Sequence, residues 1–132
     1  MDKNIEIASK IVDLKILLDR CCEGRNKEFG LFLTTYQILF LVSKNDHIAP
    51  KFIMEKLGIA KSNLAIATRS LIKDGYVIKE VDTLNRRQIY YSITDAGRSF
   101  LNQKLHQVSS DLPEMSELDS GDLDRVIRLL SK

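Results

Sequence analysis

Residues 71–94 constrain the fold most, because within this segment the end of a helix is followed directly by two short strands. Gly75 closes a polar helix predicted over 61–74, since glycine readily adopts the conformation that ends a helix. Alternate residues then share a face over 77–81 and again over 89–93, which is the period of half-buried strands. The segment therefore predicts a hairpin with a basic tip. An ordinary hairpin in an α+β domain is the alternative.

Two more helices are predicted upstream. The sequence TTYQ at 34–37 fits a capping box, in which a threonine oxygen and a glutamine three residues on satisfy free backbone amides, so we expect a helix over 35–44. Pro50 suits the first position of the next helix, and a tight turn at 58–60 leads into the helix at 61–74. The order is helix, turn, helix and hairpin, which predicts a winged helix-turn-helix.

The helix at 61–74 has one apolar face. Leu64, Ala67 and Leu71 recur at helical spacing and are expected to face the core. The side chains left on the other faces are those of Lys61, Ser62, Asn63, Ala65, Ile66 and Arg69. Amide and guanidinium groups form paired hydrogen bonds with base edges, hydroxyl groups donate or accept, and an apolar group can meet a thymine methyl. If the chain binds DNA, this outer face is the candidate surface for reading it.

Short motifs within 33–97 resemble those of one known family. The segments that carry the resemblance are Leu33-Thr34 with Gln37, Leu71 with Gly75, Val77 and Asp82, Asn85-Arg86-Arg87, and Ile93-Thr94 with Gly97. In this order and spacing they are similar to the MarR family of bacterial transcription regulators. The departures are Asn85 where the family usually has Asp, Ala60 where a capping Ser is common, and Ala65-Ile66 in place of a more polar pair.

The resemblance implies a homodimer that recognises a pseudo-palindromic operator in double-stranded DNA, with half-sites about one helical turn apart. We expect phosphate neutralisation to supply affinity and the helix at 61–74 to read bases in the major groove. On this helix Asn63 is suited to adenine and Arg69 to a guanine or a phosphate. At the wing tip, Arg86 and Arg87 would enter or flank the minor groove, where narrow A·T segments concentrate negative potential.

Amphipathic helices are predicted at both ends of the chain. The N-terminal helix has two apolar stripes, of which only one can face the chain's own domain. The first stripe is Ile7, Ile11, Leu14 and Leu18, the second is Ile5, Ala8, Val12 and Ile16, and the last helix carries Leu123, Val126, Ile127 and Leu130. We expect the first and last of these stripes to form a two-fold dimer, as the family does with its terminal helices. A monomer with a thick helical cap is the alternative.

The expected fold class is mainly α with a small β-hairpin wing, in one compact domain. Its parts are an N-terminal dimerisation helix at 1–30, the winged helix-turn-helix at 31–97 and C-terminal dimerisation helices at 98–132. A chain of 132 residues with 44% apolar residues can bury one core. No apolar run approaches the roughly 20 residues of a membrane span, and no apolar export segment follows the start, so a cytoplasmic location is expected.

The charge distribution and the absence of known catalytic motifs limit which other functions are expected. The net charge is only +2, yet residues 61–91 carry six basic against three acidic side chains, while 111–124 carry six carboxylates and no lysine or arginine. The sequence has no glycine-rich phosphate loop, no HExxH and no GxSxG. His47 and His106 have no ligand at metal spacing. We therefore expect no enzyme, no cofactor and no metal site.

Two features bear on regulation. Cys21 and Cys22 are adjacent, and reduced thiols that pack or stay neutral are favoured over a redox switch, although some MarR-like proteins sense oxidants through a cysteine of their first helix. Family members also bind small aromatic or amphipathic anions between the dimer helices and the DNA-binding lobe. Tyr36 and Phe40 could line such a pocket, and a role as core aromatics is favoured.

A protein-binding module is the candidate function of a different class. It would keep the winged-helix scaffold and hold a partner regulator, since a fold alone does not fix a function. The low net charge and the apolar pair Ala65-Ile66 favour this alternative, whereas Arg86 and Arg87 oppose it.

Overall fold

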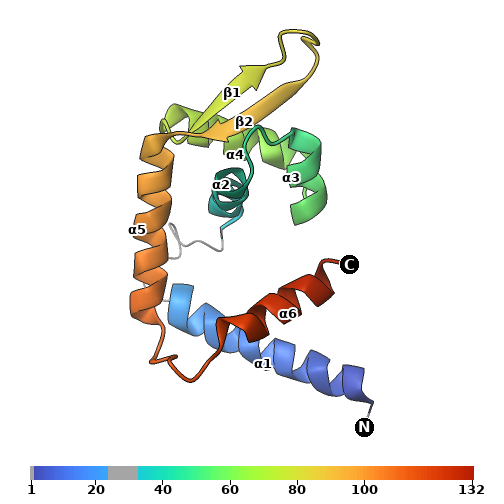
Figure 1. Ribbon diagram of the computed structural model, residues 1–132, viewed down its shortest axis with the longest axis vertical. Coiled ribbons are helices and arrows are strands. Elements are labelled where there is room, and N and C mark those ends of the chain that lie inside the picture. Colours follow the sequence, from blue (N-terminus) through green and yellow to red (C-terminus); the bar gives the residue numbers. More distant parts are fainter. Residues whose placement is uncertain (1, 24–32) are drawn as a thin grey trace.

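The computed structural model describes residues 2–23 and 33–132. Over these residues the chain forms helices and one antiparallel hairpin (Figure 1). In chain order the elements are α1 (Lys3–Glu23), α2 (Thr34–Lys44), α3 (Pro50–Leu57), α4 (Lys61–Lys73), β1 (Val77–Val81), β2 (Ile89–Ile93), α5 (Asp95–Asp111) and α6 (Ser120–Leu130). The predicted mainly α fold with a hairpin wing is confirmed, whereas the predicted boundary between residues 30 and 31 lies outside the described residues.

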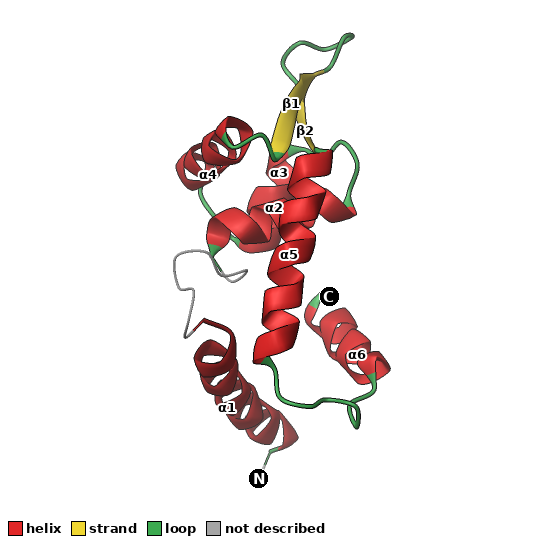
Figure 2. Ribbon diagram, turned by 90° about the vertical axis from the view of Figure 1, so that its left-hand side faces the viewer, coloured by secondary structure: helices red, strands yellow, loops and turns green. Residues whose placement is uncertain are grey.

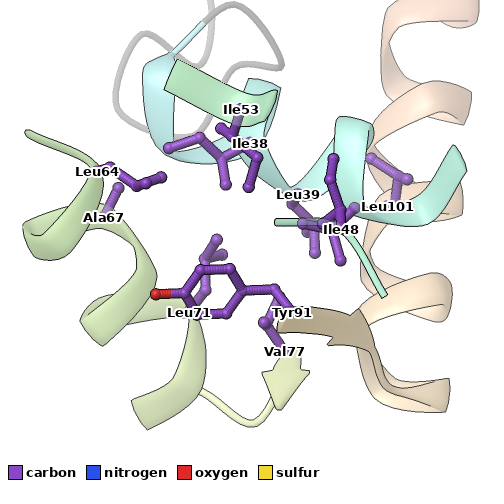
Figure 3. Packing of buried hydrophobic residues seen from close by; sticks show 11 residues of the cluster. Ile38, Leu39, Ile48, Ile53, Leu64, Ala67, Leu71, Val77, Tyr91 and Leu101 are labelled. Atoms are coloured by element: carbon purple, nitrogen blue, oxygen red, sulfur yellow. The ribbon is translucent and has the colours of Figure 1, made fainter. Parts of the chain in front are cut away.

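The core lies between α2, α4, α5 and the base of the hairpin, with α2 in contact with α4, β2 and α5. Figure 3 shows side chains from these elements converging on one cluster. Its buried members are Ile38, Leu39, Val42, Ile48, Ile53, Leu64, Ala67, Leu71, Val77, Tyr91 and Leu101. A single cluster of this kind fixes the position of α4 relative to the wing, and thus the geometry of any site built on both.

The helix-turn-helix follows from local signals that the structure confirms. Pro50 begins α3, where its missing N–H costs nothing. Gly58 ends α3 at φ 63°, a left-handed conformation that glycine adopts without a steric penalty. At the end of α4, the Tyr76 N–H donates to the Leu71 carbonyl at 2.9 Å and the Gly75 N–H to that of Ile72 at 3.0 Å. These two bonds form a Schellman motif, which stops the helix and turns the chain into β1.

The hairpin pairs Val77 with Ile93 at its base and Val81 with Ile89 toward its tip. In β1 the expected half-buried alternation holds only near the base, since Val77 is buried and Val81 is exposed. In β2 no residue is exposed, and Ile89, opposite Val81, still packs against the core cluster. A third segment adds to the sheet: Ile48 and Tyr91 exchange backbone hydrogen bonds of 3.0 and 2.9 Å.

The capping box predicted for α2 is wrong. Leu33 is the N-cap residue and makes no side-chain capping bond, so the helix begins at Thr34 rather than within a threonine cap. A threonine cap does exist at α5. There the Thr94 hydroxyl accepts from the Gly97 N–H at 3.0 Å and donates to the Gly75 carbonyl at 2.6 Å. This pair of bonds ties the start of α5 to the start of the wing.

Gly97 is required by close packing against the wing. A Cβ at this position would overlap the Tyr76 carbonyl oxygen and lie 2.8 Å from Cγ1 of Ile93. Contacts this short are not tolerated in protein interiors, so α5 can approach the hairpin only with a glycine here. The Thr94 and Gly97 pattern thus has a structural cause.

The helices α1 and α6 lie at the far end of α5 from the wing (Figures 1 and 2). At most one stripe of α1 was expected to face the chain's own domain, and both stripes are largely exposed. α6 has no buried residue at all. Within the single chain these helices have too little surface to pack against. None of the described helices is long and apolar enough to cross a membrane.

Candidate nucleic-acid interface

The outward face of α4 is free of the core, as the sequence predicted. All six side chains assigned to it are exposed, from Lys61 to Arg69, while Leu64, Ala67 and Leu71 are buried. The inner face includes one polar residue that the sequence reasoning missed. Thr68 is buried, and its hydroxyl donates to the Leu64 carbonyl at 2.8 Å, so the group is satisfied within the helix. The outer face is therefore presented on a firmly packed helix.

The tip of the wing is ordered by its own side chains. The Asp82 carboxylate accepts from the Leu84 N–H at 2.9 Å, and the Asn85 amide oxygen accepts from the Arg87 N–H at 3.2 Å. Backbone bonds from Gln88 to the Asn85 carbonyl (3.0 Å) and from Asp82 to the Gln88 carbonyl (2.9 Å) close the loop. Asparagine in place of the family's aspartate therefore still shapes the turn, because either side chain supplies the accepting oxygen.

Two cations are displayed on this loop. Arg86 and Arg87 are exposed, and no ion pair within the described residues engages either guanidinium. Unpaired arginines on a shaped loop can approach phosphates or a narrow minor groove without first breaking an internal salt bridge. Chemically the tip is thus suited to a polyanion.

Both strands of the wing contact the loop between α2 and α3. His47, which has a positive φ of 52°, places Nδ1 2.6 Å from a carboxylate oxygen of Glu80 on β1. The backbone pairing of Ile48 with Tyr91 lies directly beside it. The sequence showed only that His47 has no ligand at metal spacing, and nothing in it links His47 to Glu80, 33 residues away. The His47–Glu80 contact and the Ile48–Tyr91 pairing fix the angle between the wing and the helix-turn-helix.

A groove of 410 Å³ runs between the start of α2 and the flank of α4. Its lining residues are Thr34, Thr35, Ile59, Asn63, Ile66, Ala67 and Ser70. Two of the candidate base-reading residues, Asn63 and Ile66, therefore stand beside hydroxyl groups of both helices. The surface around α4 is hollowed and mixed in polarity rather than uniformly cationic.

Tyr36 and Phe40, the candidate effector residues, are half-buried on α2. The Tyr36 ring lies 5.2 Å from that of Phe100, which stacks on Tyr76 at 4.4 Å. Burial raises the pKa of Tyr36, and the nearby Asp74 and Tyr76 raise it further. Both candidates pack against the core cluster, and neither lines the groove beside α4. An effector pocket at these residues stays a prediction.

The cysteine pair is described only in part. Cys21 lies near the end of α1, half-buried and without a disulfide. The side chain of Cys22 lies outside the described residues. A redox role for the pair is therefore still a prediction. Among the described side chains, no cluster of three or more histidine, cysteine or acidic residues could hold a metal ion.

Comparison with known proteins agrees with this geometry. The model of the winged helix DNA-binding domain family matches residues 35–112, which include α2 to α5 and the wing. The chain belongs to this family. The uncharacterised HTH-type transcriptional regulator YvnA of Bacillus subtilis (strain 168) is 25% identical over 81 residues, which are 60% of this chain and 52% of that protein. The winged helix described here spans about half the length of the curated relatives it matches.

Solved structures share the whole winged-helix architecture, terminal helices included. A MarR-like transcription regulator from Bacillus cereus ATCC 10987 has a TM-score of 0.66 at 20% identity, covering 97% of this chain and 95% of that one. AbfR of Staphylococcus epidermidis has a TM-score of 0.70 at 20% identity, covering 98% and 94%. AbfR has also been solved in its reduced form bound to DNA, which matches with a TM-score of 0.63 at 19% identity, covering 98% and 94%. The fold is that of MarR-like regulators.

Proposed function

We propose that this winged helix is a MarR-like transcription regulator that binds double-stranded DNA sequence-specifically as a homodimer. The proposal rests on the exposed outer face of α4, which takes no part in the core, together with the unpaired arginines of the ordered wing tip. Both belong to one packed unit, so they can act on the same duplex. The DNA-bound form of AbfR, which shares the fold, supports DNA as the partner. We propose no enzymatic activity, and the function implies a cytoplasmic location.

In the proposed complex α4 lies in the major groove. Asn63 pairs with adenine, Ile66 packs on a thymine methyl, and Arg69 reaches a guanine or a phosphate. The wing places Arg86 and Arg87 at the minor groove beside the half-site. Lysine and arginine contacts to phosphate release counterions, so affinity should fall steeply as salt is added.

The proposed dimer is built from α1 and α6. Their apolar residues are exposed in the single chain, and Ile127 and Leu130 of α6 are 61% and 72% exposed. Monomeric proteins rarely leave contiguous apolar surfaces of this extent in water, which favours a second copy as the cover. A two-fold dimer presents two copies of α4 and hence reads a pseudo-palindromic operator.

Release of DNA is proposed to follow an effector. A small aromatic or amphipathic molecule near Tyr36 and Phe40 would act where α2 meets α5, the helix that joins the wing to the terminal helices. Oxidation at Cys21 and Cys22 is the alternative route, which is not favoured. The half-buried position of Cys21 favours the first route, since a redox sensor is normally accessible to its oxidant.

The experiment is a titration of the protein against random duplex DNA at low and at moderate salt. The proposal predicts binding at low salt that weakens with a steep dependence on salt concentration. The competing function, a protein-binding module, is favoured by Ile66, which is 65% exposed at the groove beside α4. Absence of DNA binding at low salt would refute the proposal and support that alternative.

A further inference from the structure

Leu84 stands out among the described residues as a large apolar side chain with 97% of its surface exposed. Single exposed apolar residues are common on protein surfaces, so exposure alone identifies no site. The position of Leu84 is more informative. It lies at the tip of the wing, next to Asn85 and the unpaired Arg86 and Arg87.

The loop holds Leu84 away from the protein. Its N–H is bound by the Asp82 carboxylate at 2.9 Å, and the Asp82 N–H donates to the Gln88 carbonyl at 2.9 Å. Figure 2 shows the tip projecting beyond the rest of the chain. The backbone is thus shaped before any partner arrives, and binding need not order the loop to place the leucine.

We propose that Leu84 is an apolar wedge that enters the minor groove of DNA and bends the duplex. The inference rests on the proposed function, because it takes the wing as a DNA-binding element. Arginines on the same loop bring the tip to the phosphates that border the minor groove. Within that groove the sugars and base edges offer apolar surface, and leucine is among the side chains that open base steps there.

The contributions of Leu84 and of the arginines to DNA binding should depend differently on salt concentration. A phosphate contact contributes about one unit to the salt dependence of binding, whereas burial of an apolar side chain displaces no counterion. Loss of the wedge should therefore weaken binding equally at every salt concentration. This separates the action of Leu84 from that of Arg87 on the same loop.

The experiment compares the parent chain with Leu84→Ala, Leu84→Met and Thr83→Ala. The probe is a duplex selected by the parent protein from a random pool and labelled at its ends for fluorescence energy transfer. Leu84→Ala should weaken binding roughly tenfold for each wing, as expected for the loss of one buried leucine, and thus about a hundredfold for the proposed dimer, with an unchanged salt slope and a straighter duplex. Leu84→Met keeps an apolar wedge and should behave like the parent. Thr83→Ala changes the neighbouring exposed side chain and should have little effect.

The inference would be overturned if the parent and Leu84→Ala bound the duplex with equal affinity. It would also be overturned if the duplex had the same shape, bent or straight, when bound to either protein. A loss shared by Leu84→Met would also overturn it. Because the side chain is exposed, all three variants should keep the fold, which circular dichroism and thermal unfolding check. If the parent binds DNA with a steep salt dependence while Leu84→Ala matches it, only the wedge fails. If the parent binds no DNA, the proposed function fails first and the wedge with it.

Discussion

Replacing Leu14 with glutamate should break the proposed dimer. In the single chain Ile7, Ile11 and Leu14 keep 44 to 51% of their surface exposed. Full burial of such a side chain contributes about 1.5 to 3 kcal/mol, so covering the exposed half contributes about 1 kcal/mol. Two copies of Leu14→Glu would therefore cost about 2 kcal/mol, or about 30-fold in the dimer dissociation constant, before the cost of desolvating two carboxylates is added.

Sedimentation equilibrium at micromolar concentration measures this directly. The parent should be a dimer, and Leu14→Glu should be largely monomeric and lose tight operator binding, since one half-site supplies only part of the contact free energy. Asp13→Lys is the matched control, because it changes the charge of α1 by more than Leu14→Glu does but lies outside both apolar stripes. A parent that stays monomeric, or a Leu14→Glu variant that dimerises as the parent does, would refute the reasoning.

Four other outcomes are expected. Arg87→Ala should weaken binding to all sequences and lower the salt slope by about one ion, and an unchanged slope would remove Arg87 from the interface. Asn63→Ala should cost about 1 to 3 kcal/mol at one base pair while leaving non-specific affinity nearly intact, and equal losses on operator and random DNA would reassign it to a backbone contact. Gly97→Ala should lower the free energy of unfolding by about 1 to 3 kcal/mol in denaturant melts, because α5 must move away from the wing, and unaltered stability would contradict that packing. Cys21→Ser with Cys22→Ser should leave DNA release by peroxide unchanged, whereas peroxide release that disappears in the double variant would establish a redox switch.

The elements of the winged helix could be predicted from the sequence because their signals are local. Pro50 and Gly58 bound α3, and the turn at Gly75 separates α4 from the wing. Each depends on the conformation of a few neighbouring residues. The inner face of α4 followed from its spacing for the same reason.

Contacts between distant segments could not be predicted. The pairing of His47 with Glu80 and of Ile48 with Tyr91 depends on how the α2–α3 loop meets the wing, which no short motif encodes. The misplaced cap at α2 has a related cause. A threonine followed by a glutamine three residues later is compatible with a capping box, but the extended backbone at Leu33 moved the helix start one residue earlier.

The terminal helices show a different limit of prediction from sequence. Amphipathic spacing shows that an apolar stripe needs a cover, but it does not say which chain supplies the cover. The sequence therefore predicted α1 and its two stripes correctly, but allowed for one of them to face the chain's own domain. The structure leaves both exposed, which makes the dimer proposal stronger than the sequence alone did.

The central claim is that a homodimer reads DNA through two copies of α4 and the wing. A chemical protection footprint on a duplex selected from random DNA tests it most directly, with one probe for the major groove and one for the minor groove. We expect two protected major-groove segments about one helical turn apart, flanked by minor-groove protection from the two wings. Protection of a single segment, of the phosphates alone without base specificity, or of no segment at all would contradict the account.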